Sequence, residues 1–225
     1  MRELYNHQLR NLCDEIESMG KLCDNALNDA IKALQQGDQE LARSIYQSDF
    51  VIDQKEREIE NLCLSIILHQ QPIASDLRLV SASLKLITDL ERIGDQASDI
   101  AEIVMNLDYT EKSNFKLIED MALAARAMVN DAIKAFVTQD LALANQVIER
   151  DDIVDDYLVK ARDQMVSLIT EQGHSPVTIV DLIMMAKYLE RIGDHATNVA
   201  NWVIFQQTGE HPDKNTGALG SLMQA

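Results

Sequence analysis

The sequence predicts an all-α fold, built as a tandem repeat of two antiparallel three-helix bundles with six long helices in total. Three observations support this prediction. Helix-breaking residues are rare, with 3 prolines and 8 glycines among 225 residues. One block of sequence recurs at a nearly constant offset, and apolar residues follow heptad spacing through several long segments.

The breaker residues mark the expected helix ends in the first half of the chain. Gly37 interrupts a long periodic segment, and Asp38 directly after it is a good N-cap for the next helix. Pro72 pushes the preceding residue out of the α region, so that helix ends near Gln70. We therefore expect helices over about 4–36, 38–70 and 75–106, with a polar stretch at 106–114.

The same pattern then starts again. The letters of 28–33 recur at 130–135, an offset of 102, and the hexapeptide Leu-Glu-Arg-Ile-Gly-Asp at 90–95 recurs at 189–194, an offset of 99. Ser175 as N-cap and Pro176 at the first helical position predict the start of the sixth helix. We divide the chain into a first bundle over 1–107, a second bundle over 108–208 and a loose C-terminal tail over 209–225.

Heptad spacing predicts which faces of the helices are buried. The seam of the second helix and its counterpart in the fifth consist of Ile45, Ile52, Ile59 and Ile66, and of Val147, Val154, Ala161 and Leu168. The seams of the third and sixth helices consist of Leu86, Leu90, Ile93, Ala97, Ile100, Val104 and Leu107, and of Leu182, Met185, Leu189, Ile192, Ala196, Val199 and Val203.

Composition excludes several functional classes. The chain has 37 acidic and 20 basic residues, a net charge of -17, and no local basic patch, so we expect no nucleic-acid binding. No run of about 18 apolar residues and no signal-like N-terminal segment occurs, so we expect a cytoplasmic protein. Cys13, Cys23 and Cys63 lack metal-site spacing and are interpreted as small core residues.

Pairs of acidic residues four positions apart are the candidate site. Such pairs lie one turn apart on one helix face, where like charges destabilise the helix by about 0.2–0.5 kcal/mol per pair. Hard cations with oxygen ligands, such as magnesium, calcium, manganese or iron, would neutralise them. Ordinary solvated surface acids, balanced locally by Arg92 and Arg191, remain an alternative. The pairs are Asp49 with Asp53, Glu91 with Asp95, Asp151 with Asp155, and Glu190 with Asp194.

Two details bear on these pairs. Gly94 and Gly193 lie inside the acidic turns, where glycine costs about 1 kcal/mol relative to alanine; they either leave room beside the carboxylates or permit close helix packing. Asp99 extends the first acidic row, whereas the second copy has Asn198 at that position. We therefore expect two sites that are not equivalent.

Catalytic signatures are weak by comparison. A diiron-carboxylate bundle needs two Glu-x-x-His motifs that project into the core, and only Glu171 with His174 fits, near a predicted loop. His195 follows the second acidic pair and is interpreted as a surface residue or as a group at the edge of a metal site. We expect no enzyme; the alternative is a carboxylate-bridged iron or manganese metalloenzyme on a helical bundle.

The chain resembles the PhoU family of phosphate-signalling regulators, which accompany bacterial phosphate ABC transporters. The resemblance covers nearly the whole chain. It rests on the segment Gln-Pro-Ile-Ala-Ser-Asp-Leu-Arg at 71–78, on the two hexapeptide copies at 90–95 and 189–194, and on the Glu/Asp-x-x-x-Asp pairs of both halves.

This resemblance implies paired three-helix bundles, a homodimer, and multinuclear metal sites at Glu91, Asp95, Glu190 and Asp194, together with Asp49, Asp53, Asp151 and Asp155; Asp99 extends the first site. The expected ligands are divalent or trivalent metal ions, iron before zinc, manganese or magnesium. The implied function is negative regulation of phosphate uptake and of the phosphate regulon, through contacts with the transporter's ATPase subunit and a sensor histidine kinase. Membrane association would occur only through these partners.

Overall fold

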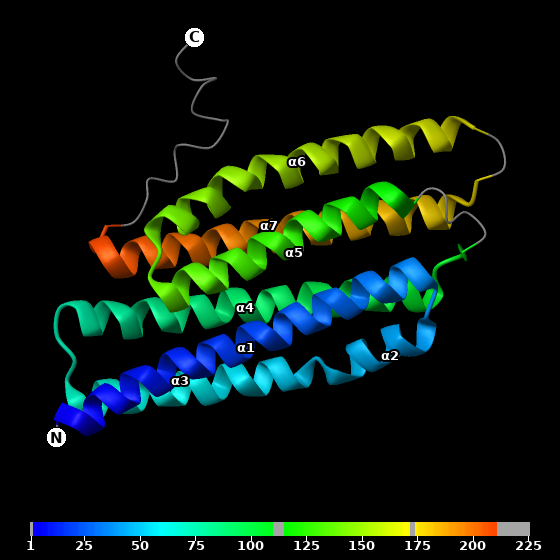
Figure 1. Cartoon of the computed structure of the whole chain (residues 1–225). Coiled ribbons are helices and arrows are strands. Elements are labelled where there is room, and N and C mark those ends of the chain that lie inside the picture. Colours follow the sequence, from blue (N-terminus) through cyan, green and yellow to red (C-terminus); the bar gives the residue numbers. More distant parts are fainter. Residues whose placement is uncertain (1, 110–114, 172–173, 211–225) are drawn as a thin grey trace, which may run out of the picture.

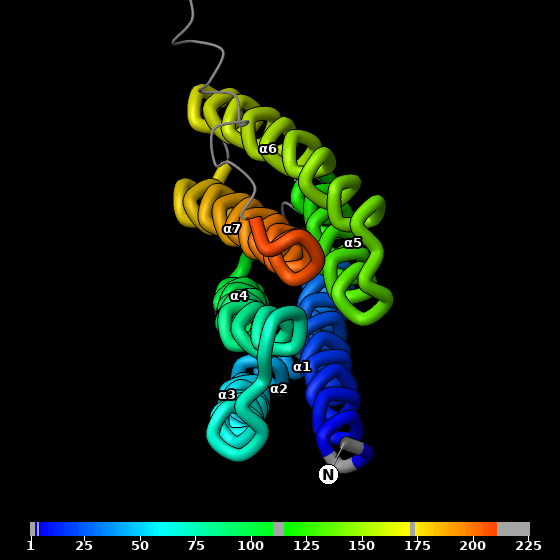
Figure 2. The backbone as a smooth tube through the Cα atoms, turned by 90° about the vertical axis from the view of Figure 1, so that its left-hand side faces the viewer, coloured from blue at the N-terminus to red at the C-terminus, as the bar shows by residue number. Residues whose placement is uncertain are grey.

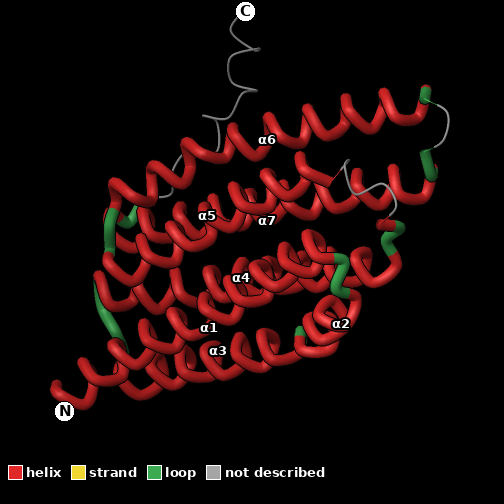
Figure 3. The backbone as a smooth tube through the Cα atoms, turned by 45° about the vertical axis from the view of Figure 1, so that its right-hand side comes forward, coloured by secondary structure: helices red, strands yellow, loops and turns green. Residues whose placement is uncertain are grey.

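The computed structural model describes residues 2–109, 115–171 and 174–210. All regular secondary structure in these ranges is helical, which confirms the predicted all-α class (Figure 3). The helices are α1 (Arg2–Gln36), α2 (Gln39–Ser48), α3 (Phe50–Gln70), α4 (Ser75–Asn106), α5 (Lys116–Thr138), α6 (Leu141–Thr170) and α7 (Pro176–Thr208).

The helices run along a common direction and form two bundles (Figure 1). One bundle contains α1, α2, α3 and α4, and the other contains α5, α6 and α7. Viewed end-on, α6, α7, α4 and α3 follow one another on one side, while α5 and α1 lie side by side on the other (Figure 2). The two bundles therefore meet along two lines of contact, α4 against α7 and α1 against α5.

The helix starts that the sequence predicted are stabilised as expected. Asp38 accepts a hydrogen bond from the Leu41 backbone N–H at 2.9 Å, and Asp140 accepts one from Leu143 at 3.0 Å. Ser175 caps α7, with Pro176 as the first helical residue. These side-chain acceptors satisfy backbone donors that a helix leaves free at its first turn.

The six-helix plan is confirmed, and within it the second predicted helix is divided into two consecutive pieces. It is interrupted at Asp49, which separates α2 from α3, whereas its counterpart α6 runs unbroken. At the break the Ile52 backbone N–H donates to the Asp49 carbonyl oxygen, a tighter turn than the α-helical one, and the Ser48 hydroxyl donates to the Ile45 carbonyl oxygen. Such serine back-bonding bends helices.

The predicted core seams are confirmed. Every seam residue of α2, α3, α4, α6 and α7, and Leu107 directly after α4, is buried, with exposed fractions from 0% to 8%. The core also takes in Phe115 and Phe136 of the second bundle. Cys23 and Cys63 are buried and Cys13 is partly buried, all as free thiols. The seams leave the acidic residues on the flanks of the helices.

Three further observations concern the chain as a whole. Within the described ranges, no helix combines the length and apolar character that crossing a bilayer requires. The predicted division near 107 and 108 falls between the end of α4 and the start of α5. The predicted tail over 209–225 lies outside the described residues from position 211 onward.

Candidate metal centres

The first carboxylate cluster forms where the α2–α3 break faces the middle of α4. Asp49 lies at the break, Asp53 lies one turn further along α3, and Asp95 comes from α4. One carboxylate oxygen from each of the three lies within 4.8 Å of the others, and all three residues are partly buried. The structure thus brings together residues that are up to 46 positions apart in sequence.

Close packing of α3 on α4 brings these carboxylates together. Gly94 faces Ile52, and a Cβ at position 94 would lie 2.8 Å from Ile52 Cδ1. The absent side chain therefore permits close helix packing, with Ile52 in the place that a Cβ would take. Gly94 also lines a pocket of about 310 Å³ together with Asp49 and Ile52, so space remains beside this carboxylate. Glycine in mid-helix costs about 1 kcal/mol relative to alanine. At position 94 it allows α3 and α4 to approach each other closely.

Glu91 and Asp99 extend the cluster along α4 on either side of Asp95. Glu91 has a side chain only 18% exposed, and its Oε2 atom is buried without a hydrogen-bond donor. The Arg92 guanidinium Nε lies 3.4 Å from that oxygen but does not hydrogen-bond to it. A buried carboxylate oxygen without a donor is unfavourable, so this atom is suited to a cation.

The electrostatics of the first cluster favour protonation or a bound cation. Burial, followed by the charges of Asp95, Asp53 and Asp99, raises the pKa of Asp49 to about 6. Burial and the charge of Asp95 raise the pKa of Glu91 to about 7, against the opposing effect of Arg92. Burial likewise raises the pKa values of Asp95 and Asp99. Each shift shows that ionising the group is unfavourable in this surrounding.

Arginines balance part of this charge, as the alternative of ordinary surface acids requires. Arg92 Nη1 donates to Asp95 Oδ2 at 3.1 Å, and Arg57 Nη2 lies 3.8 Å from Asp53 Oδ2. Their side chains are 55% and 72% exposed, respectively, so these pairs are weak. Arg191 opposes the raised pKa of Asp99 through its charge. These arginines do not balance the cluster, since the pKa values of Asp49, Glu91, Asp95 and Asp99 remain raised.

The second cluster has the same plan on α6 and α7. Gly193 faces Asp151 and Val154, and a Cβ there would lie 3.3 Å from Asp151 Oδ1. Burial and the charges of Asp194 and Asp155 raise the pKa of Asp151 to about 6. The pKa values of Asp155 and Asp194 are also raised, by burial first and then by Glu190.

The two clusters differ in compactness. Glu190 repeats the situation of Glu91, with a side chain 15% exposed and an Oε2 atom that is buried without a donor, while Lys187 binds its other oxygen at 2.6 Å. Asp155 and Asp194, however, are exposed. Among the described residues, only the trio of the first cluster places three ligand atoms within 4.8 Å of one another.

These residues fit a hard cation. All nine sequence-predicted side chains offer oxygen ligands, which magnesium, manganese, calcium and iron accept, and each cluster contains one buried oxygen without a donor. When bound, a cation would supply positive charge that holds neighbouring helices together. Asp49, Asp53, Glu91, Asp95 and Asp99 would hold it in the first bundle, and Asp151, Asp155, Glu190 and Asp194 in the second.

Sequence reasoning missed Asp89. This α4 residue lies at the contact with α7, where its carboxylate accepts hydrogen bonds from His195, Asn198 and Trp202. His195 thus has a partner in the other bundle, and its charge also acts on Asp95 and Asp194, which places it beside both clusters. A signal was present, since the repeat copies differ at Asp89 and Tyr188 beside an otherwise identical hexapeptide.

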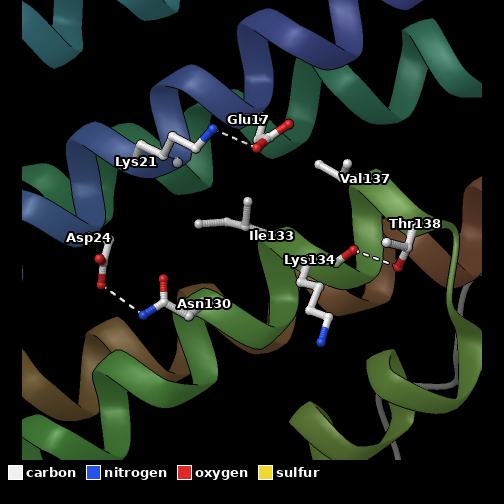
Figure 4. Close-up of a pocket in the computed structure, with 9 residues that line it drawn as sticks. Glu17, Lys21, Asp24, Asn130, Ile133, Lys134, Val137 and Thr138 are labelled. Atoms are coloured by element: carbon white, nitrogen blue, oxygen red, sulfur yellow. Dashed lines mark hydrogen bonds and ion pairs between the residues drawn. The ribbon is translucent and has the colours of Figure 1, made fainter.

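The second line of contact carries a charged pair and a groove. Arg126 of α5 binds both carboxylate oxygens of Asp24 in α1, at 2.6 and 3.0 Å, and Asn130 donates to the same carboxylate at 2.7 Å. Figure 4 shows Ile133 projecting toward α1 beside this group. The groove, of about 340 Å³, lies away from both carboxylate clusters and is lined by residues of α1 and α5.

The alternative of a diiron enzyme gains no support from the placement of its motif. Glu171 ends α6 and His174 precedes α7, and the two side chains lie 3.4 Å apart at this turn. Glu171 is 62% exposed there. The motif therefore does not project into the bundle core, where a diiron site of this type lies.

Fold and site together define a class: a tandem-repeat helical protein with one carboxylate cluster in each repeat. The PhoU domain matches this chain twice, at residues 16–104 and 118–203. The chain belongs to the PhoU family.

Individual relatives agree with this assignment. The phosphate-specific transport system accessory protein PhoU homolog of Clostridium acetobutylicum is 34% identical over 216 residues, which covers 95% of this chain and 99% of that protein. Homolog 1 of Thermotoga maritima is 37% identical over 210 residues, which covers 92% and 90%. The crystal structure of the phosphate transport system regulatory protein PhoU from Streptococcus pneumoniae is similar, with a TM-score of 0.86, 26% identity and coverage of 93% and 99%. These relatives are named as accessory or regulatory proteins and not as enzymes.

Proposed function

We propose that this chain is a negative regulator of phosphate uptake and of phosphate-regulon signalling. In this proposal it acts in the cytoplasm as a cation-binding adaptor between the ATPase subunit of a phosphate ABC transporter and a sensor histidine kinase. The observation that carries the proposal is the PhoU domain match in both repeats. The names of the relatives, which connect them with phosphate-specific transport, support it further.

The carboxylate clusters are the proposed cation platform. The family resemblance implies iron first, with zinc, manganese or magnesium as alternatives. The oxygen ligands and the buried Glu91 and Glu190 oxygens without a donor support a bound cation without choosing among these ions. Cation binding would offset repulsion among the acidic groups and rigidify the surface shared by α3, α4, α6 and α7. A rigid surface of defined charge is suited to docking partner proteins.

The regulatory role is tested by deletion of the gene in its native host. In phosphate-rich medium the deletion strain should express phosphate-starvation genes, and the wild-type gene supplied in trans should restore repression. Unchanged repression in the deletion strain would refute the proposal. Affinity capture with the tagged ATPase subunit and the tagged kinase tests each partner, and light scattering tests whether the chain forms the proposed homodimer.

The cation platform is tested in the same complementation assay. The Asp53→Asn/Asp95→Asn variant removes two charges from the first cluster, and we expect weaker repression and lower iron content by elemental analysis. Asp120→Asn is the matched control, because Asp120 lies on α5, outside both clusters, and pairs with Lys116. Full repression by the cluster variant would show that regulation does not need the platform.

A further inference from the structure

Asp89 joins the two bundles beside the carboxylate clusters. Its side chain is 15% exposed and comes from α4, one residue before the hexapeptide. The carboxylate accepts hydrogen bonds from His195 Nδ1 at 2.9 Å, Asn198 Nδ2 at 3.1 Å and Trp202 Nε1 at 3.0 Å. All three donors come from α7, so one acidic group fixes this stretch of the α4–α7 contact.

The repeat-related contact differs in its charged groups. At the offset of 99, Asp89 corresponds to Tyr188 and Asn198 corresponds to Asp99. Tyr188 lies near Asp99, since burial and then the charge of Asp99 raise the pKa of the phenol. In both contacts α4 supplies the carboxylates that face α7: Asp99 and Glu102 lie near Tyr188, and Asp89 faces Asn198. The position of Asp99 thus carries an amide in the second repeat, and the position of Tyr188 carries a carboxylate in the first.

This exchange explains why the second acidic row is shorter. An aspartate at position 198 would place a second carboxylate against Asp89, and two carboxylates at hydrogen-bond distance repel each other unless one is protonated. Asn198 instead donates its amide N–H to Asp89. The amide is thereby engaged in the bundle contact, and the second row keeps only Glu190 and Asp194 on α7.

We propose that Asp89 makes the two carboxylate clusters unequal, so that the first cluster binds divalent cations more tightly than the second. This inference rests on the proposed cation platform and names the residue that makes the cation affinities of its two clusters differ. The physical reason is the number of charged ligands, which tunes cation affinity in oxygen sites. The first row has Asp99 available, whereas the equivalent Asn198 of the second row is neutral and held by Asp89.

The test exchanges the carboxylate of Asp89 and the amide of Asn198 across the α4–α7 contact. The proteins compared are wild type, Asn198→Asp, Asp89→Asn and the double variant Asp89→Asn/Asn198→Asp. Thermal unfolding of the metal-free proteins reports on the contact itself. Binding of Mn²⁺ is followed by titration calorimetry in an Asp53→Asn/Asp95→Asn background, which removes two of the five carboxylates of the first cluster and so reports mainly on the second.

We expect Asn198→Asp to lower the melting temperature and the double variant to restore part of the loss. The amide and carboxylate then exchange sides, but an asparagine at position 89 offers His195 and Trp202 one oxygen in place of two. In the double variant the second cluster should bind Mn²⁺ about tenfold more tightly than in the same background without the exchange. Asp99→Asn, made in otherwise wild-type protein, should weaken the first cluster by a similar factor. Asn61→Asp, an exposed site on α3, controls for the added charge and should change neither quantity.

The outcomes separate this inference from the platform on which it rests. If wild-type protein binds no Mn²⁺ or Fe²⁺ at all, the cation platform is wrong and this inference falls with it. If wild-type protein binds Mn²⁺ with equal affinity at both clusters, the inference alone is wrong. It is also wrong if the stably folded double variant shows unchanged affinity at its second cluster.

Discussion

Gly94 of α4 lies directly against Ile52 of α3, with Ile52 Cδ1 2.8 Å and Cγ2 3.1 Å from the position that a Cβ would take. This contact sets the spacing between the helices that carry Asp53 and Asp95. Ile52 itself is 5% exposed and belongs to the hydrophobic core. Core packing and the geometry of the first carboxylate cluster are therefore determined by the same pair of residues.

Gly94→Ala should destabilise the protein. Alanine favours a helix by about 1 kcal/mol over glycine, whereas overpacking a core costs about 1–3 kcal/mol. We expect the overpacking to dominate, with a net loss of about 1 kcal/mol in the free energy of unfolding, measured by urea denaturation.

Two variants check the cause. Gly193→Ala should cost less, because its nearest contacts are 3.3 Å to Asp151 Oδ1 and 3.4 Å to Val154 Cγ1. Ile52→Val removes the Cδ1 atom, so Gly94→Ala should be less destabilising in that background. Equal effects of Gly94→Ala in both backgrounds would show that Ile52 does not determine the cost.

Metal-free protein should become less stable as pH rises from about 4 to 7. The folded-state pKa values of Asp49 (about 6), Glu91 (about 7) and Asp151 (about 6) lie above their ordinary values. In this window the folded state holds more protons than the unfolded state, so the free energy of unfolding falls with increasing pH. Melting temperatures at pH 5.0, 6.0 and 7.5 measure the slope.

The slope has its own matched control. The Asp49→Asn/Glu91→Gln variant removes two of the shifted groups and should have a flatter dependence than wild type. Asp120→Asn, at a partly exposed α5 site away from both clusters, should leave the dependence unchanged. A metal-free wild-type protein that becomes more stable from pH 5.0 to 7.5 would contradict the raised pKa values.

Divalent cations should stabilise the protein most where the carboxylates are ionised. A ligand that binds only the folded state at about 100 times its dissociation constant adds about 2.7 kcal/mol. We therefore expect Mn²⁺ to raise the melting temperature more at pH 7.5 than at pH 5.0, and a chelator to reverse the effect. The Asp53→Asn/Asp95→Asn variant should show a smaller rise, and an unchanged rise would place the bound ion elsewhere.

Arg126→Met should weaken the contact between the bundles. Arg126 binds Asp24 through two hydrogen bonds, and this interaction is the first cause of the lowered pKa of Asp24. Side-chain exposures are 29% and 22%, and charged hydrogen bonds of this kind contribute about 1.5–3 kcal/mol when shielded. We expect a loss of about 1–2 kcal/mol by urea denaturation. Arg43→Met removes a 53% exposed partner of Glu40 and should cost close to nothing.

The local features of this fold were predictable because they depend on neighbours in sequence. Asp38 and Ser175 cap the starts of helices, Gly37 lies between α1 and α2, and Pro72 lies between α3 and α4. Each of these features follows from a short stretch of sequence. Heptad spacing predicted which residues are buried, since a regular helix places every seventh residue on nearly the same face. The break at Asp49 was missed, because the second copy carries a similar acidic pair on an unbroken helix.

The sequence by itself determined the repeat, the helices, the buried seams and the acidic pairs, because periodicity and spacing within one helix encode them. The tertiary structure decided which pairs meet. It placed Ile52 against Gly94, so that Asp49, Asp53 and Asp95 converge. It also gave Asp89 its three donors from α7. Such contacts depend on the distance and rotation between packed helices, which no single segment of the sequence contains.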